Sequence, residues 1–165
     1  MVERRPVGPG DAAFLRELYA TTRPEVAGWD KAERDGFLEL QLQAQERGWA
    51  ARFPDSRHEL IQLAGRPVGR LWVAWSAEEC RLVDLALLPA YRRSGIGTHV
   101  VGEVLAEAER AGVPTRLTVE RTNAASLTFC ERLGFQVFAE DSVFVMLERP
   151  VSPASPPRAS RAASR

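Results

Sequence analysis

A strand that runs directly into a glycine-containing turn and a helix, at residues 82–98, restricts the fold of this chain more than any other segment. The apolar run from Leu82 leads to Arg92-Arg93-Ser94-Gly95-Ile96-Gly97-Thr98, after which a helical pattern begins at once. The glycines allow a tight turn that presents successive backbone N–H groups on one side. These groups and the positive end of the helix dipole form an anion site, and Arg92 and Arg93 add charge beside it. The segment therefore predicts a pyrophosphate-binding site.

Two common phosphate-binding motifs fit this turn poorly. A dinucleotide fingerprint requires a third glycine at position 100, where this chain has Val100. A P-loop requires Gly-Lys-Ser/Thr, whereas Lys31 is the only lysine of the chain. A glycine-rich helix start that binds nothing is the structural alternative, and the Gly-x-Gly spacing alone does not exclude it.

Hydrophobic periodicity and turn residues divide the chain into strands and helices. We predict strands at residues 2–7, 59–63, 68–75, 80–88, 115–119, 135–139 and 143–147. We predict helices that begin at Asp11 and Asp30, helices at 95–111 and 123–133, and irregular structure at 21–28 and 48–57. The order is β-α-α-β-β-β-α-β-α-β-β, an α/β protein with a mixed sheet and helices packed on it. Residues 1–150 are expected to form one domain, and the Pro-, Ser- and Arg-rich residues 151–165 a disordered tail.

Two motifs together resemble the signatures of the GNAT superfamily of acetyl-CoA-dependent N-acetyltransferases. The first is Arg92-x-x-Gly95-x-Gly97 after the strand end Ala86-Leu87-Leu88-Pro89. The second is Asn123-x-x-Ser126-x-x-Phe129-Cys130-x-x-x-Gly134-Phe135, at the expected distance downstream. The resemblance covers roughly residues 59–147, and the two N-terminal helices also fit the order of elements in this family.

The resemblance implies acetyl-CoA as the co-substrate and assigns its binding residues. The backbone of Leu85, Ala86 and Leu87 is expected to pair with the pantetheine arm as an added strand would. The turn is expected to hold the pyrophosphate with Arg92, Arg93, Ser94, Gly95, Ile96, Gly97 and Thr98. Asn123 and Ser126 are expected to contact the cofactor from the other side. Family members splay the strands at 82–88 and 115–119 apart, and the thioester lies in that gap.

The catalytic residues are less clearly marked. Many members place a tyrosine at the position of Cys130, where it is thought to protonate the departing thiolate; Cys130 is a candidate for this role, or else a small buried hydrophobic residue. Asp84 interrupts an apolar strand just before the cofactor-binding backbone, so it is the first candidate for a general base that deprotonates the amine. The alternatives for Asp84 are a solvent-facing polar residue or a partner for an arginine. Glu120, at the end of the next strand, is the second candidate.

The acceptor is left open by the sequence. Tyr19, Arg23 and Trp29 lie where the family's acceptor-lid helices meet and are expected, with Glu120, to shape the acceptor pocket. An amino acid, a small amine, an antibiotic or a protein N-terminus would all fit. The leading prediction is direct acetyl transfer to a primary amine in a ternary complex. The alternatives are a non-catalytic acyl-CoA-binding or sensor domain, and an interaction module that acts through the basic tail.

The composition limits the possible binding partners and the cellular location. Lys+Arg and Asp+Glu are equal at 22 each, so bulk charge does not point to nucleic acid or to a membrane surface. Two cysteines without metal-ligand spacing favour a reducing compartment and predict no metal site. The N-terminal residues lack the apolar run of a signal peptide, and no apolar stretch is long enough to span a membrane. We therefore expect a cytoplasmic protein, either a monomer or a homodimer.

Overall fold

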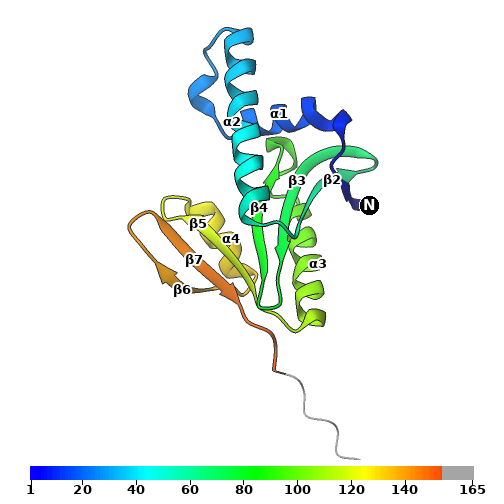
Figure 1. Cartoon of the computed structure of the whole chain (residues 1–165). Helices are drawn as coiled ribbons and strands as arrows, with labels where there is room; N and C mark the ends of the chain where they lie inside the picture. The colour runs from blue at the N-terminus through cyan, green and yellow to red at the C-terminus, as the bar shows by residue number, and fades with distance from the viewer. Residues whose placement is uncertain (154–165) are drawn as a thin grey trace, which may run out of the picture.

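A seven-stranded mixed sheet organises the computed structural model of the chain, which describes residues 1–153 (Figure 1). The strands are β1 (Val2–Pro6), β2 (Ser56–Leu63), β3 (Arg66–Trp75), β4 (Cys80–Leu87), β5 (Thr115–Glu120), β6 (Gln136–Glu140) and β7 (Phe144–Arg149). Their order is β1-β2-β3-β4-β5-β7-β6, and every neighbouring pair is antiparallel except β4 and β5. The predicted α/β class and the predicted order of elements are confirmed.

Within the described residues 1–153, four α-helices and three short 3-10 helices connect the strands. The α-helices are α1 (Ala12–Ala20), α2 (Lys31–Arg52), α3 (Ile96–Ala111) and α4 (Ala124–Arg132). The 3-10 helices are Pro9–Asp11, Pro24–Val26 and Pro89–Tyr91. Among residues 1–153, no helix combines the length and the apolar composition that a membrane span requires.

The two faces of the sheet are covered by different helices. Ile61 of β2 packs with Val100 and Val104 of α3 in one buried cluster, which also includes Cys130 of α4. Its neighbour Leu60 packs instead with α1 and α2 in a second cluster. Because successive side chains of a strand point to opposite faces, α1 and α2 cover one face, while α3 and α4 cover the other.

The prediction of irregular structure at residues 48–57 is wrong. Residues 48–57 continue α2 to Arg52 and then enter β2 at Ser56, so only residues 53–55 lie outside regular structure. Gly48 and the nearby Pro54 favour an earlier helix end, but α2 continues past Gly48. Trp49, on the continued helix, packs edge-on against Trp72 of β3 with ring centroids 5.4 Å apart. This tertiary contact outweighs the low helix propensity of one glycine.

The helix ends that frame the site follow their sequence signals. Gly112 ends α3 in the left-handed conformation, with φ of 70°. The Asn123 side chain caps α4 by accepting a hydrogen bond from Ser126 N–H. Asp11 precedes α1 as predicted but makes no side-chain cap; its carboxylate binds Arg5 and the Gly8 N–H. The Arg5 contact, followed by the Gly8 contact, lowers the pKa of Asp11 to about 2.

The tail prediction reaches beyond the described residues. Residues 154–165 of the predicted tail lie outside the part of the chain that the structure describes. Within that part, the Ser152 N–H donates to Glu109 at the end of α3, at 2.9 Å.

Candidate active site

The strands β4 and β5 separate soon after they begin. They pair only through Cys80 with Thr115 and Arg81 with Arg116. Beyond this point β5 continues with β7, and β4 continues with β3, so β5 pairs with none of Leu85, Ala86 and Leu87. The predicted cofactor-binding strand segment therefore faces a gap in the sheet, where an extended ligand can take the place of a neighbouring strand.

The N-terminus of α3 opens beside this gap with unpaired donors. Gly95 adopts φ of 86° and ends the turn, and His99 is the first residue of the helix whose N–H finds a backbone acceptor, the Gly95 carbonyl. Within residues 1–153, no hydrogen bond engages the N–H groups of Ile96, Gly97 and Thr98. Three free donors at the positive end of a 16-residue helix are suited to bind a phosphate.

Position 97, in the first turn of α3, has space for a side chain. A Cβ at position 97 would lie 3.5 Å from Phe129 and 3.8 Å from Leu87, which is ordinary contact distance, and the backbone of Gly97 is not in the left-handed region. Neither the packing nor the backbone of the protein therefore requires glycine here. A ligand that approaches the Gly97 N–H closely would require glycine at this position. The residues present therefore fit a bound pyrophosphate.

Arg92 ties the turn to two other parts of the site. Its Nε donates to the Leu87 carbonyl at 2.9 Å, and its Nη2 donates to Thr21 Oγ1 at 3.3 Å, just after α1. The Ser94 hydroxyl donates to the Tyr91 carbonyl at 2.6 Å, and Arg93 is exposed with φ of 58°. The structure thus gathers the predicted pyrophosphate residues into one turn, where Arg92 has a structural contact and Arg93 remains exposed.

Gly69 is a site-shaping residue that the sequence analysis missed. It pairs with Leu87 across β3 and β4, and a Cβ at this position would lie 2.4 Å from the Ala86 carbonyl oxygen and 2.6 Å from Leu87 Cδ2. No side chain fits at these distances, so Gly69 lets β3 approach β4 where the predicted pantetheine contacts lie. A glycine inside a predicted strand was the available signal.

The second motif places Cys130 in the core. Asn123 caps α4, and its Oδ1 accepts a hydrogen bond from the backbone N–H of Ser126 on the first turn, at 3.1 Å. Cys130, one helical turn later than Ser126, is buried, and burial raises the pKa of its thiol to about 11. The thiol is therefore protonated at neutral pH, which disfavours a role as a nucleophile.

Asp84 has an arginine partner, as one of its predicted alternatives required. It follows an irregularity in the β3–β4 register, where Trp72 pairs with Asp84 but Val73 pairs with Leu82. Its Oδ2 accepts a hydrogen bond from Arg70 Nε at 2.8 Å. No hydrogen bond from residues 1–153 engages its Oδ1, and 26% of the side chain is exposed. One oxygen is thus fixed and the other is available, beyond the point where β4 and β5 part.

The predicted acceptor residues fall into three places. Tyr19 is buried, and its hydroxyl accepts hydrogen bonds from Arg23, whose guanidinium also lies over the Tyr19 ring. Trp29 is 44% exposed and packs against Phe37 of α2, with ring centroids 5.0 Å apart. Glu120 is exposed at the end of β5. Hydrogen bonds join Tyr19 to Arg23, and none within residues 1–153 joins either of them to Trp29 or Glu120.

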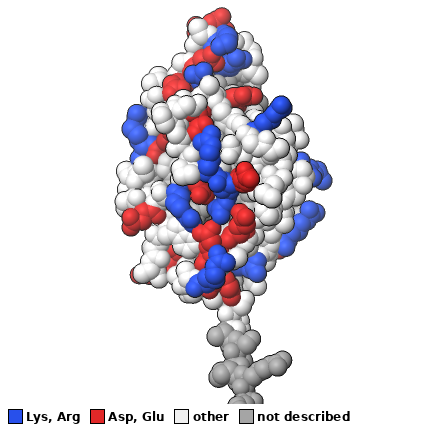
Figure 2. All heavy atoms as spheres, turned by 90° about the vertical axis from the view of Figure 1, so that its right-hand side faces the viewer, with Lys and Arg blue, Asp and Glu red and all other residues white. Residues whose placement is uncertain are grey.

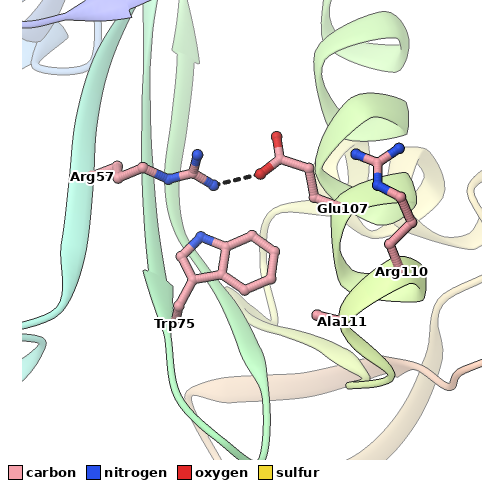
Figure 3. A pocket seen from close by; sticks show the side chains of 5 residues that line it. All are labelled: Arg57, Trp75, Glu107, Arg110 and Ala111. Atoms are coloured by element: carbon pink, nitrogen blue, oxygen red, sulfur yellow. Dashed lines mark hydrogen bonds and ion pairs between the residues drawn. The ribbon is translucent and has the colours of Figure 1, made fainter.

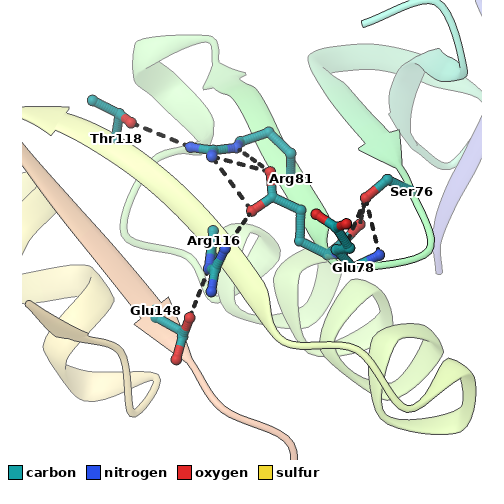
Figure 4. Close-up of polar contacts among 7 residues, drawn as sticks. Ser76, Glu78, Arg81, Arg116, Thr118 and Glu148 are labelled. Carbon is teal, nitrogen blue, oxygen red and sulfur yellow. Dashed lines mark hydrogen bonds and ion pairs between the residues drawn. The ribbon is translucent and has the colours of Figure 1, made fainter. Parts of the chain in front are cut away.

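The paired end of β4 and β5 carries a network of opposite charges (Figure 4). Arg116 binds Glu148 of β7 at 2.6 Å and Glu79 at 3.3 Å, and Arg81 binds Glu79 at 3.0 Å. Arg81 also donates to Thr118 at 3.4 Å. Each guanidinium is matched by a carboxylate, so the network ties β4, β5 and β7 together at the end opposite the gap.

Two hollows in the surface lie away from the predicted site. One, of about 480 Å³, lies between β2, β3 and α3 and is lined by Arg57, Trp75, Glu107, Arg110 and Ala111 (Figure 3). Arg57 there binds Glu107 at 2.6 Å and lies over the Trp75 ring, so its charge is already matched. Figure 2 shows acidic and basic side chains interleaved on the face that includes α3. A second hollow, of about 200 Å³, lies around Phe53, Trp75 and Arg81. We place the site at the strand gap instead, because unpaired polar groups meet there.

The comparison with known families decides the class of the protein. The sequence pattern of the Acetyltransferase (GNAT) family matches residues 13–135. The chain belongs to this family. The predicted family and fold are therefore confirmed, and the family's name, acetyltransferase, agrees with the predicted enzyme class.

Individual relatives of this GNAT protein match only part of the chain or share low sequence identity with it. The [ribosomal protein bS18]-alanine N-acetyltransferase of Escherichia coli K12 is 37% identical over 59 residues, 35% of this chain and 40% of the relative. The chain thus matches less than half the length of that curated relative. The paia N-acetyltransferase of Thermoplasma acidophilum, solved in complex with coenzyme A, superimposes with a TM-score of 0.69 at 18% identity, covering 91% of this chain and 99% of that one. The structure of the ribosomal-protein-S18-alanine N-acetyltransferase of Escherichia coli gives a TM-score of 0.66 at 18% identity, covering 94% and 97%.

Proposed function

We propose that this chain transfers an acetyl group from acetyl-CoA to a primary amine by direct attack in a ternary complex. The observation that carries the proposal is the early parting of β4 from β5 beside the three free N–H groups of α3. Acetyl-CoA is the co-substrate, as predicted, and coenzyme A is bound in the Thermoplasma structure of the same fold. Two free, buried cysteines fit a reducing cytoplasm.

Each part of the site has a separate task in this proposal. The N–H groups of Ile96, Gly97 and Thr98 hold the pyrophosphate, with Arg93 beside them. When bound, acetyl-CoA supplies an activated acetyl group, whose carbon–sulfur bond breaks as the carbon–nitrogen bond to the amine forms. The backbone at Leu85–Leu87 orients the pantetheine arm and polarises the acetyl carbonyl.

Asp84 is proposed to transfer a proton, and Cys130 is assigned no covalent role. Asp84 accepts a proton from the amine nitrogen through its free Oδ1. Cys130 lies in the core as a protonated thiol, so the covalent acetyl-cysteine route is disfavoured and direct attack is preferred. Tyr19, Arg23, Trp29 and Glu120 are proposed to border the acceptor. Asn123 and Ser126 are proposed to contact the cofactor from α4.

The cofactor claim is tested by calorimetry with acetyl-CoA and CoA on three proteins. Gly97→Glu puts a carboxylate beside the pyrophosphate and is expected to raise Kd by at least about 100-fold. Glutamate near a helix N-terminus favours the helix, so folding is preserved. Gly102→Glu is the matched control, because a Cβ at this exposed position of α3 meets no atom within 4 Å. Wild type that binds no CoA, or equal binding by all three proteins, would overturn the proposal.

The acceptor is then sought with a defined panel. The Escherichia coli relative is named for acetylating an alanine of ribosomal protein bS18, so peptides with a free N-terminal alanine come first. Small amines, amino acids and aminoglycosides follow, with release of CoA as the readout. Turnover of one amine identifies the acceptor class. Tight binding without turnover of any amine would favour the sensor alternative over the enzyme.

A further inference from the structure

Arg70 occupies an unusual place for an arginine. It is the only charged residue among residues 1–153 that is buried, with 4% of its surface exposed. Its guanidinium lies between β4 and α2. Nε binds Asp84 at 2.8 Å, and Nη2 binds Gln45 at 2.9 Å. The group also lies over the Trp49 ring, 5.2 Å from its centroid. One arginine thus links the candidate base to α2.

Stability alone does not account for this arginine. Burying a charge is unfavourable, and apolar residues of similar volume often serve a protein core as well or better. The pairing is also incomplete. Nη1 lies 3.5 Å from Glu46 Oε1, and both of these buried atoms lack a hydrogen-bond partner within residues 1–153. The good contacts of Arg70 are those to Asp84 and Gln45, which points to a role in placing Asp84.

The contact fixes Asp84 in a way that serves its proposed task. Because Oδ2 accepts from Arg70, rotation of the carboxylate is restrained, and Oδ1 remains the oxygen without a partner. We propose that Arg70 is a positioning residue, which holds Asp84 so that Oδ1 takes the proton of the attacking amine, and that Gln45 of α2 holds Arg70 in turn. This inference rests on the proposed function, since it requires Asp84 to act as the base.

Glu46 is consistent with this division of roles. Burial raises the pKa of Glu46, and neighbouring Arg70 only partly offsets that effect, while Glu39 adds to it. The cation of Arg70 is thus shared unequally between the two carboxylates it faces. Asp84 has the short hydrogen bond, and Glu46 has a longer contact without one.

A double-mutant cycle tests the inference, with acetyl-CoA and the first amine that the acceptor panel identifies. The variants are Arg70→Met, Asp84→Asn and the pair together. Arg70→Met is expected to lower kcat by about 10–100-fold in the wild-type background, and by less than about twofold in the Asp84→Asn background. CoA affinity is expected to be unchanged in all three. Arg70→Lys keeps the charge but not the planar fork, so it is expected to recover only part of the rate.

A milder variant covers the case in which Arg70→Met does not fold. Gln45→Ala keeps the buried ion pair and is expected to lower kcat by about threefold to tenfold, with KM for acetyl-CoA unchanged. Arg66→Gln, an exposed arginine on the same strand, is the control for loss of a positive charge.

The outcomes separate this inference from the function on which it rests. Equal losses from Arg70→Met in the two backgrounds, or full activity of Gln45→Ala, would overturn the positioning role while leaving the acetyltransferase intact. Wild type that binds acetyl-CoA but acetylates no amine would overturn both. A loss in kcat that disappears when Asp84 is already replaced supports the inference.

Discussion

The two ends of the β4–β5 pair differ in how their polar groups are satisfied. At the paired end, the strands exchange backbone hydrogen bonds, and Arg81 and Arg116 meet Glu79 and Glu148. At the open end, β5 pairs with none of Leu85–Leu87, the first N–H groups of α3 are free, and Asp84 has one unengaged oxygen. The protein completes its own contacts at one end and leaves donors and acceptors available at the other. We therefore base the proposed site on unpaired polar groups rather than on the hollow of Figure 3.

The first prediction has the largest expected effect and compares the loss of one carboxylate at each end. Asp84→Asn is expected to lower kcat by about 10²–10⁴-fold, because an amide does not accept the amine proton, while CoA affinity stays unchanged. Glu148→Gln removes a carboxylate at the paired end and is expected to change kcat by less than about twofold and stability by less than about 1 kcal/mol. Steady-state kinetics and calorimetry measure both. Similar kinetic losses in the two variants would remove the functional distinction between the ends.

The second prediction disturbs the strand that borders the gap. Gly69→Ala places a Cβ 2.4 Å from the Ala86 carbonyl oxygen, so β3 and β4 must move apart. We expect the free energy of unfolding to fall by about 1–3 kcal/mol and CoA affinity to fall about tenfold. Denaturant unfolding and calorimetry provide the two measurements. Gly102→Ala, which meets no atom within 4 Å, is the control and is expected to retain full affinity. Unchanged CoA binding by Gly69→Ala would show that the position of Ala86–Leu87 does not matter to the cofactor.

The third prediction concerns Cys130, which lies in the core rather than in either polar end. Since its thiol has a pKa of about 11, it donates a proton to a leaving thiolate only uphill. Cys130→Ala is therefore expected to lower kcat by less than about tenfold, well below the loss from Asp84→Asn. Mass spectrometry after incubation with acetyl-CoA alone is expected to show no acetyl adduct on wild-type enzyme. An adduct that Cys130→Ala abolishes would instead establish the covalent route.

The sequence predicted the open end of the site better than the contacts behind it. The turn at Arg92–Thr98 and the cap at Asn123 depend on glycines and on a capping side chain, which act over a few residues and leave a local signal. Arg70, Gln45 and Gly69 depend on which residues face one another across β3, β4 and α2. Such pairings have no signature within a single segment. Asp84 lay between the two cases: its interruption of an apolar strand was visible, but its partner was not.

The end of α2, which the sequence analysis missed, also depends on contacts between elements. It gives the prediction with the smallest expected effect. Within the local sequence, Gly48 indicates a helix end. The packing of Trp49 against Trp72 and beneath Arg70 instead keeps the helix intact to Arg52. Because Gly48 is helical and a Cβ there meets no atom within 4 Å, Gly48→Ala is expected to raise the free energy of unfolding by about 0.5–1 kcal/mol. Denaturant unfolding measures the gain, with Gly65→Ala as the contrasting case, since φ of 74° at Gly65 makes alanine unfavourable. No gain from Gly48→Ala would mean that this turn of α2 is frayed, and Gln45 and Trp49 would then no longer hold Arg70 against Asp84.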